Sequence, residues 1–354
     1  MTDTRIRVAV VGVGGWGPVH ARAFSNRSDA ELCAVVDCDP GTADARGREF
    51  RVPCYLDIDE MLRTERPDLV SLAVTNTRQV EPTLALIRAG VPLLVEKPLA
   101  FALADADMLL AEAAERRLFF AINFNYRYAR PVRLAYEAIQ QGRIGEPIFA
   151  AWRFEGSKSP TDHPHANLIE TQCHGFDMLE HCCGPIESLM AEMTDVTQGG
   201  FTTLVVSLKF ASGAVGCIIG SYDSSYEYAN TQVLEVNGTT GRVIVEDTVR
   251  RFTFQEKGSE MRQVWETGYF NDSDRTIRKL IDVHLDELLA AFRAGREPPV
   301  HARAGRRALA LAEAAIASCR TGRRVLVDRA DGPIMPVGLQ GRPPSHGTIV
   351  EARL

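Results

Sequence analysis

Apolar and polar positions follow two different rhythms along the chain. In the first third, short runs of apolar, often β-branched residues recur at 6–11, 32–37, 69–74, 92–96 and 118–122. Continuous apolarity over so few residues is typical of parallel strands that are covered on both faces. Between these runs, residues 78–89 and 103–116 carry apolar side chains three and four positions apart, which predicts helices. Residues 1–125 are therefore predicted to form a doubly wound α/β sheet of about five parallel strands.

From residue 126 onward the apolar positions alternate with polar ones. Runs of period two occupy 203–210, 214–222, 231–238 and 242–248, and glycines or an Asn-Gly turn separate them. This pattern is typical of hairpins in an antiparallel sheet with one covered face. Helical spacing recurs at 130–141, 174–183, 275–294 and 303–320. We expect an α+β domain over 126–330, built on a large, mainly antiparallel open sheet, and an extended tail rich in proline and glycine over 331–354.

Composition agrees with two folded domains and narrows the class of protein. The chain has 354 residues, of which 45% are hydrophobic and 24% charged, as in ordinary globular proteins. A formal charge of −6 argues against nucleic acid as a partner. No apolar run is long enough to span a membrane, and the N-terminus lacks the pattern of a signal peptide. The eight cysteines form no CxxC pair, so we expect reduced thiols and a cytoplasmic protein.

A glycine-rich loop follows the first predicted strand and precedes a predicted helix. It reads Gly12-Val13-Gly14-Gly15-Trp16-Gly17, with Pro18 in the first helical turn. In a GxGxxG loop the first glycine permits a tight turn, the second lets the backbone approach a pyrophosphate, and the third lets helix and strand pack closely. Asp37 ends the second strand twenty residues after Gly17, where a carboxylate would accept hydrogen bonds from ribose hydroxyls. The combination predicts dinucleotide binding.

The residues around Asp37 favour NAD over NADP. A carboxylate at this position would repel a 2′-phosphate, and the next residue is Cys38 rather than an arginine. Arg46 and Arg48 on the following predicted helix keep NADP open as the less favoured alternative.

Lysine is scarce in this chain, and one of its five lysines follows a predicted strand directly. The sequence Glu96-Lys97-Pro98 stands at the carboxyl end of the run at 92–96, the sheet edge at which ligands bind in open α/β folds. A lysine at a strand end is usually a solvated surface charge. Pro98, however, restricts Lys97 to an extended conformation, as expected if the placement of its side chain matters.

These motifs together resemble the Gfo/Idh/MocA family of sugar and cyclitol oxidoreductases. The similarity rests on the glycine loop, Asp37, the Asn76 segment, the Glu-Lys-Pro sequence and the change to a hairpin-rich domain, and it runs from residue 5 to about 325. It includes INFNYRYAR at 122–130, similar to the family's crossover into the second domain. It also includes LIETQCHGFDMLEHCCG at 168–184, in which the family carries an acid, a histidine and an aspartate.

The resemblance implies a set of site residues. Lys97, His174 and Glu170 would be catalytic, with Lys97 and His174 facing the substrate hydroxyl beside the nicotinamide and Asp177 also reaching the substrate. The implied cofactor contacts, besides the glycine loop with Gly15 and Trp16, are Asp37, Thr75, Asn76, Gln79, Glu96 and Lys97. Two positions depart from the family pattern: Glu170 replaces an aspartate of many sugar dehydrogenases, and Gln79 stands where a histidine is usual.

The expected chemistry is alcohol oxidation, which needs a base that accepts the hydroxyl proton while hydride leaves the carbon. Partial burial and the positive nicotinamide ring would lower the pKa of Lys97, and a histidine already titrates near pH 6.5. We therefore expect Lys97 to be the proton acceptor or a substrate clamp, with His174 as the alternative base. Glu170 precedes His174 by four residues, so one helix containing both would let the carboxylate orient the imidazole.

Further polar and aromatic residues near this window are candidates for the substrate pocket. They are Tyr126, Arg127, Trp152 and His163, with core packing or solvation as the alternative for each; Lys158, His165 and Asn167 lie in the same polar loop as His163. Zinc sites usually contain pairs of ligands in a CxxC or similar spacing, and none occurs among Cys173, His174, His181, Cys182 and Cys183. The side chains of adjacent cysteines in a helix also point about 100° apart. We expect no metal.

Three functions fit these observations. The leading one is an NAD-dependent dehydrogenase acting on a secondary hydroxyl of a sugar, sugar derivative or inositol. The second is a family member with tightly held NAD that oxidises a sugar transiently in order to cleave or rearrange it. The third is a non-catalytic NAD-binding regulatory protein. The resemblance also implies a homodimer or homotetramer, for which the broad second sheet offers a face.

Overall fold

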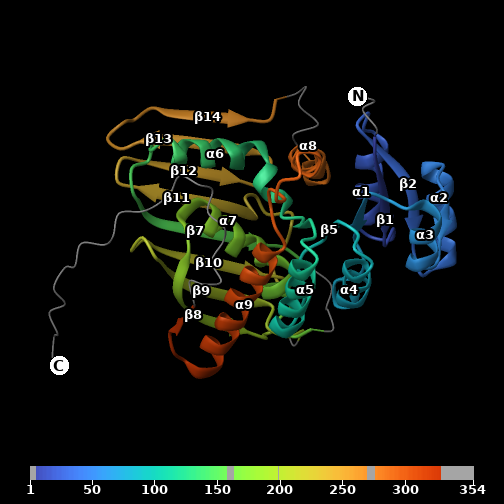
Figure 1. The fold of residues 1–354 in the computed structure, drawn as a ribbon. Coiled ribbons are helices and arrows are strands. Elements are labelled where there is room, and N and C mark those ends of the chain that lie inside the picture. Colours follow the sequence, from blue (N-terminus) through green and yellow to red (C-terminus); the bar gives the residue numbers. More distant parts are fainter. Residues whose placement is uncertain (1–4, 158–162, 198, 269–275, 328–354) are drawn as a thin grey trace.

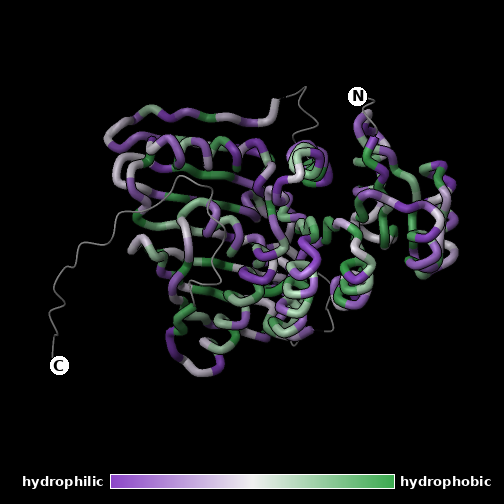
Figure 2. Tube along the Cα trace, viewed as in Figure 1, coloured by the Kyte–Doolittle hydropathy of each residue, from purple (hydrophilic) through white to green (hydrophobic). Residues whose placement is uncertain are grey.

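Two sheets with helices packed against them make up the described part of the chain (Figure 1). The computed structural model describes residues 5–157, 163–197, 199–268 and 276–327. The predicted fold class is confirmed, with a parallel sheet followed by a mostly antiparallel one. Hydrophobic residues line the strands of both sheets (Figure 2). The predicted tail at 331–354 and Lys158 lie outside the described residues, and the predicted division after residue 125 stays a prediction.

The first sheet contains six parallel strands in the order β3-β2-β1-β4-β5-β6. Their bounds are β1 Ile6–Val11, β2 Ala30–Val36, β3 Cys54–Tyr55, β4 Leu69–Leu72, β5 Leu93–Val95 and β6 Phe120–Ile122. Five correspond to the predicted runs, and β3, only two residues long, gave no apolar pattern. The strand order reverses between β1 and β4, which places a ligand crevice outside the carboxyl ends of these strands.

Five helices of the first sheet follow its strands: α1 Gly17–Ser25, α2 Pro40–Phe50, α3 Ile58–Glu65, α4 Val80–Arg88 and α5 Leu103–Glu115. The side chains of Asp39 and Asp57 cap α2 and α3 by accepting backbone N–H groups of the first turn. The predicted helix at 78–89 begins two residues later than expected, because Asn76–Arg78 forms the 3₁₀ turn η1. This turn presents Thr75 and Asn76 at the carboxyl end of β4.

The second sheet contains nine strands in the order β14-β13-β12-β11-β7-β10-β9-β8-β15. Their bounds are β7 Pro147–Glu155, β8 Ile186–Thr194, β9 Thr203–Phe210, β10 Val215–Ser221, β11 Gln232–Gly238, β12 Gly241–Glu246, β13 Arg251–Glu256, β14 Arg262–Glu266 and β15 Val325–Leu326. All neighbours are antiparallel except β7 and β10. The four predicted runs are β9 to β12, and buried residues alternate with exposed ones along β9 as expected for one covered face.

Four further helices complete the described fold: α6 Arg130–Gln140, α7 Cys173–Cys183, α8 Leu280–Arg293 and α9 Arg303–Thr321. Helices α6, α7 and α9 pack on strands of the second sheet. Helix α8 is different, since its residues Ile281, Leu285 and Leu288 join the apolar cluster formed by β1, β2 and α1. The chain therefore returns to the first sheet after completing most of the second. No helix among the described residues is long and apolar enough to cross a bilayer.

Candidate active site

Lys97 and Glu170 bring the two sheets together at the carboxyl edge of the first one. Lys97 follows β5, and its Nζ donates a hydrogen bond of 3.0 Å to the backbone carbonyl of Glu170. Glu170 belongs to a single-turn π-helix, η3 (Asn167–Thr171), which directly precedes α7. Such turns leave backbone groups available for other contacts and recur at functional sites. Two predicted catalytic residues, 73 positions apart in the chain, are thus in direct contact.

The glycine loop has the shape that a pyrophosphate requires. Gly12 has a positive φ of 80°, and a Cβ there would lie 2.8 Å from the backbone of Ala73. A Cβ at Gly17 would lie 1.8 Å from the carbonyl oxygen of Gly12, so helix α1 and β1 approach each other only with glycine here. Nothing lies within 4 Å of a Cβ placed at Gly14 or Gly15. The open space therefore lies over the middle of the loop, at the N-terminus of α1, where phosphate binds best.

Asp37 is fixed beside this loop. One of its carboxylate oxygens accepts the N–H of Val13 at 2.9 Å, and the other accepts the N–H of Asp39 at 3.0 Å. Each oxygen keeps a lone pair for a ribose hydroxyl. Arg46 also reaches the loop and donates to the Val13 carbonyl at 3.3 Å, whereas Arg48 pairs with Asp44 on its own helix. The residues of the loop and Asp37 therefore fit a bound dinucleotide.

The Glu96 carboxylate lies beneath Lys97 and gathers three donors. One oxygen lies 2.8 Å from His20 Nε2 and 2.7 Å from Asn123 Nδ2, and the other accepts the backbone N–H of Lys97 at 3.1 Å. Burial alone would raise the pKa of Glu96, but the hydrogen bond from His20 and the positive charge of Lys97 lower it below its ordinary value. The carboxylate is therefore ionised at neutral pH.

This cluster continues on both sides through buried groups, and we call it the buried network: Ser71, His20, Glu96, Asn123 and His284. Each of the five is at most 7% exposed. Because the Asn123 amide nitrogen donates to Glu96, its oxygen must accept from His284 Nδ1 at 2.8 Å. His284 Nε2 is then a buried acceptor without a partner. Burial lowers the pKa of His284 to about 3, which keeps this ring neutral.

Gln79 supports the same turn from another side. Its side-chain nitrogen donates to the carbonyl oxygens of Glu96 at 2.6 Å and of Pro98 at 2.9 Å, and the residue is fully buried. The carbonyls on both sides of Lys97 are therefore clamped by one side chain. Gln79 was expected to contact the cofactor; the described contacts are to the backbone around Lys97, and the cofactor contact stays a prediction.

His174 lies in the first turn of α7, under two aromatic rings. Tyr126 stacks on it with ring centroids 3.9 Å apart, and Phe124 meets it edge-on at 5.8 Å. Burial, and secondarily the charge of Lys97, lower the pKa of His174 well below its ordinary value, so the imidazole is neutral. Its Nδ1 is buried and has no hydrogen-bond partner. Glu170 lies in η3 rather than α7, and its expected role in orienting His174 stays a prediction.

The side chains of Arg127 and Trp152, which were predicted to line the pocket, form hydrogen bonds within the protein, Arg127 with Asp177. Arg127 Nε donates to one Asp177 carboxylate oxygen at 2.8 Å and Nη2 donates to the other at 2.5 Å. Trp152 is 2% exposed, and its Nε1 donates to the Gln172 side-chain oxygen at 3.1 Å. A Cβ at Gly175 would lie 2.5 Å from the indole, so Trp152 packs directly beneath α7. Substrate contacts from these residues stay predictions.

Sequence reasoning missed a group of tyrosines on the second-domain side. The hydroxyl of Tyr222 lies 2.5 Å from Thr171 Oγ1, immediately after Glu170. The ring of Tyr226 covers Gly156, where a Cβ would lie 2.2 Å from the ring, and the residue is 54% exposed. His163, which was predicted, packs against Phe101 with centroids 4.9 Å apart. No spacing in the sequence identifies Tyr222, because its contact with Thr171 joins residues 51 positions apart in the chain.

The histidines and cysteines of the window at 168–184 do not converge on one point. His181 stacks on Tyr136 with centroids 4.0 Å apart, away from His174 and its aromatic cover. Over the residues that the structure describes, no group of three or more His, Cys, Asp or Glu side chains could hold a metal ion.

Comparison with known proteins places these features in a family. The model described as the oxidoreductase family with an NAD-binding Rossmann fold matches residues 6–124, and the model for the C-terminal alpha/beta domain of the same family, Gfo/Idh/MocA, matches residues 136–327. Myo-inositol 2-dehydrogenase of Thermotoga maritima is 28% identical over 349 residues, which cover 92% of this chain and 100% of that protein.

Solved structures agree with the sequence relatives. A probable dehydrogenase from Thermotoga maritima is 26% identical with a TM-score of 0.78, over 91% of this chain and 98% of the other. Levoglucosan dehydrogenase, solved with NADH and levoglucosan, has a TM-score of 0.83 at 17% identity, over 92% of this chain and 100% of the other. At that identity the second likeness concerns the fold alone.

Proposed function

The chain belongs to the Gfo/Idh/MocA family of NAD-binding oxidoreductases, and on that premise we propose that it transfers hydride between NAD and a secondary hydroxyl of a sugar, sugar derivative or inositol. The observation that supports this proposal most directly is the contact of Lys97 with the carbonyl of Glu170, beside the buried ring of His174. These groups stand at the carboxyl edge of the sheet that also carries the glycine loop.

The roles of the side chains follow from their protonation and contacts. When bound, NAD supplies the hydride acceptor. Lys97 already donates to an oxygen atom, the Glu170 carbonyl, and in this proposal the same ammonium holds the substrate hydroxyl. The neutral imidazole of His174 is in the state that a base requires, so it can accept the hydroxyl proton if Lys97 acts as the clamp. The inverse arrangement, with Lys97 as base, uses the same two groups.

Two finer points belong to the same proposal. The substrate class is supported by the Thermotoga maritima relative, a myo-inositol 2-dehydrogenase that matches 92% of this chain. The preference for NAD over NADP is supported by Asp37 beside the loop, although Arg46 donates to the same loop. Turnover measured with both cofactors tests this preference directly.

One face of the second sheet, which none of the described helices covers, supports a homodimer or homotetramer. It carries the exposed apolar side chains of Phe149, Val205, Val215 and Ile219 on the adjacent strands β7, β9 and β10. In the register, Ile219 pairs with Val205 and Val215 pairs with Phe149, so these side chains form one patch. Light scattering of the purified chain tests this proposal, and a mass of one chain would contradict it.

The test of the proposed reaction is a panel of sugars and inositols with NAD, monitored by the absorbance of the reduced nicotinamide. Wild-type protein should accumulate NADH on at least one compound, and Lys97→Ala should lose that turnover while calorimetry still detects NAD binding. Lys257→Ala, an exposed lysine directly after β13, is the matched control and should keep full turnover. Near-normal turnover of Lys97→Ala would contradict the assigned role. Substrate consumption without accumulated NADH would instead indicate transient oxidation.

A further inference from the structure

His20 joins the glycine loop to the turn that carries Lys97. It lies in the first turn of α1, three positions after Gly17, and its backbone N–H bonds to the carbonyl of Trp16 at 3.3 Å. The side chain is fully buried. Its Nδ1 lies 2.7 Å from the Ser71 hydroxyl on β4, and its Nε2 lies 2.8 Å from the Glu96 carboxylate after β5. One ring therefore spans the helix of the loop and two strands.

The proton on His20 Nε2 is fixed by its partner. An ionised carboxylate only accepts hydrogen bonds, so Nε2 must donate to Glu96. The same Glu96 oxygen also accepts from Asn123 at 2.7 Å, which leaves the second oxygen free to accept the Lys97 N–H at 3.1 Å. Two donors thus orient the carboxylate, and the carboxylate orients the backbone of Lys97. The Lys97 side chain then reaches the Glu170 carbonyl at 3.0 Å.

We propose that His20, with Asn123, is a positioning residue for Lys97. His20 and Asn123 hold the Glu96 carboxylate against the backbone of Lys97, and His20 thereby links the position of the Lys97 ammonium to the helix that follows the cofactor loop. The kinetic consequence rests on the proposed function, but the placement itself does not. The fully buried side chain of His20 bonds to Ser71 and Glu96, so in this proposal it acts on Lys97 through Glu96.

A purely structural role for His20 would be to staple α1 to the sheet. Its neighbours on α1, Val19, Ala21 and Phe24, already do this through apolar contacts in the cluster formed with β1 and β2. An apolar residue at position 20 would extend that packing without burying two polar ring atoms. His20 instead forms a buried hydrogen bond to Glu96, the residue that directly precedes Lys97. This contact favours a role in positioning Lys97 over a role only in attaching α1 to the sheet.

The experiment compares His20→Leu with His20→Gln. Leucine removes the donor to Glu96, whereas the glutamine amide can restore it. On a substrate found by the panel, His20→Leu should lower kcat by about ten- to a hundredfold, the range expected for displacement of a reacting group by about 1 Å. The KM for NAD should change by less than about threefold, because in this proposal the loop backbone keeps its geometry. His20→Gln should recover most of kcat.

A second readout needs no turnover. Lysines of the folded protein are acetylated with a limiting amine-reactive ester, and mass spectrometry gives the rate for Lys97 relative to the exposed Lys257. His20→Leu should raise this ratio by about fivefold, since the Lys97 ammonium loses one net hydrogen bond, and His20→Gln should return it toward the wild-type value. A structural staple would lower the melting temperature of His20→Leu and leave the ratio unchanged, and that result would overturn the proposal.

The two readouts separate the proposals. If the panel yields no NADH but the Lys97 ratio rises in His20→Leu, the proposed reaction fails and the positioning role stands. If NADH forms and Lys97→Ala abolishes it, while kcat and the ratio are unchanged in His20→Leu, the reaction stands and the positioning role is wrong.

Discussion

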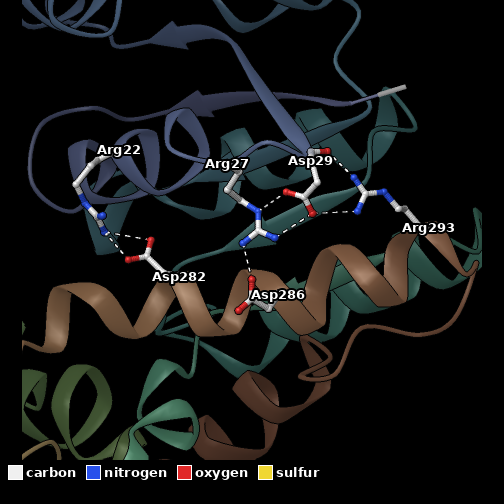
Figure 3. Close-up of polar contacts among 6 residues, drawn as sticks. All are labelled: Arg22, Arg27, Asp29, Asp282, Asp286 and Arg293. Carbon is white, nitrogen blue, oxygen red and sulfur yellow. Dashed lines mark hydrogen bonds and ion pairs between the residues drawn. The ribbon is translucent and has the colours of Figure 1, made fainter. Parts of the chain in front are cut away.

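Two polar networks connect α8 with α1 and the loop that follows α1, and they differ in exposure. The buried network runs from His20 on α1 through Glu96 and Asn123 to His284 on α8. The second, which we call the surface network, consists of the six residues in Figure 3: Arg22, Arg27, Asp29, Asp282, Asp286 and Arg293. In the buried network the side chains of His20 and Glu96 are 0% and 9% exposed, whereas Asp282 and Asp286 are 37% and 66% exposed.

Exposure decides what each network contributes. In the surface network, Arg22 reaches Asp282 at 3.2 Å and Arg27 reaches Asp286 at 2.7 Å. Water replaces either partner when the other is removed, so such pairs typically stabilise by less than about 1 kcal/mol. In the buried network no water replaces a lost partner, and the remaining groups keep their full desolvation cost. The surface network fastens α8 along its outer side, whereas the buried one contains the Glu96 carboxylate that accepts the backbone N–H of Lys97.

The two networks should differ most in the free energy of unfolding that is lost when one carboxylate charge is removed from each. Glu96→Gln replaces a carboxylate that accepts three hydrogen bonds with an amide. The amide NH₂ group cannot accept, so at least one of the three buried donors loses its acceptor. We expect the free energy of unfolding to fall by about 3 kcal/mol, because buried donors lose their acceptor. Urea denaturation of Glu96→Gln and wild type gives this difference from the two transition midpoints.

The matched control is Asp282→Asn, which makes the same chemical change in the surface network. Its loss should stay below about 1 kcal/mol. Equal losses in Glu96→Gln and Asp282→Asn would contradict the view that burial separates the two networks.

The contributions of the two networks to the free energy of unfolding should also be lost in different ranges of pH. The folded-state pKa of His284 is lowered to about 3 by burial, whereas a histidine in the unfolded chain titrates near 6.5. The unfolded chain therefore binds a proton as pH falls below 6.5 while the folded chain does not, so stability decreases with falling pH. Between pH 7 and pH 5 the expected loss is about 2 kcal/mol. Asp29 behaves differently: the hydrogen bond from Arg27 lowers its pKa to about 2, so its contribution is present above pH 4 and lost only toward pH 2.

His284→Asn isolates this effect. Asparagine can still donate to Asn123 but does not titrate, while His174 and the other histidines titrate alike in both proteins. The stability of wild type relative to His284→Asn should therefore fall by about 2 kcal/mol when denaturation at pH 7 is compared with pH 5. A difference that stays constant over this range would show that His284 is not held neutral by burial.

Much of the first sheet was predictable because its strands are continuous apolar runs. Such runs are expected where a strand is covered on both faces, since both sets of alternating side chains are then buried. The second sheet was predicted at β9 to β12, where alternation is regular, but β7 was not. Its residues Ile148 to Trp152 are all apolar and so do not alternate, and the neighbours that make it a strand, β10 and β11, come more than sixty residues later in the chain. Pairing over such distances leaves no local signal.

The candidate site was predictable where a motif carries a backbone constraint. Glycine at 12 and 17 reflects contacts that exclude a Cβ, and such positions can be recognised in one sequence. His20 could not be found in this way, because its partners Ser71 and Glu96 are 51 and 76 residues away. Its only signal is a histidine at an inward position of an apolar helix, and such a residue is more often a satisfied core histidine than part of a site.

The smallest expected effect concerns salt. Arg27 pairs with Asp29 and with Asp286, and both contacts face solvent in part. Arg27→Gln should lower the free energy of unfolding by less than about 1 kcal/mol at low ionic strength, and the difference from wild type should disappear in 1 M NaCl, where the screening length is about 3 Å. The loss caused by Glu96→Gln should persist in the same salt, because ions do not enter the buried network. If salt reduced both losses alike, the Glu96 cluster would be reached by solvent, and its role beneath Lys97 would have to be that of an ordinary surface ion pair.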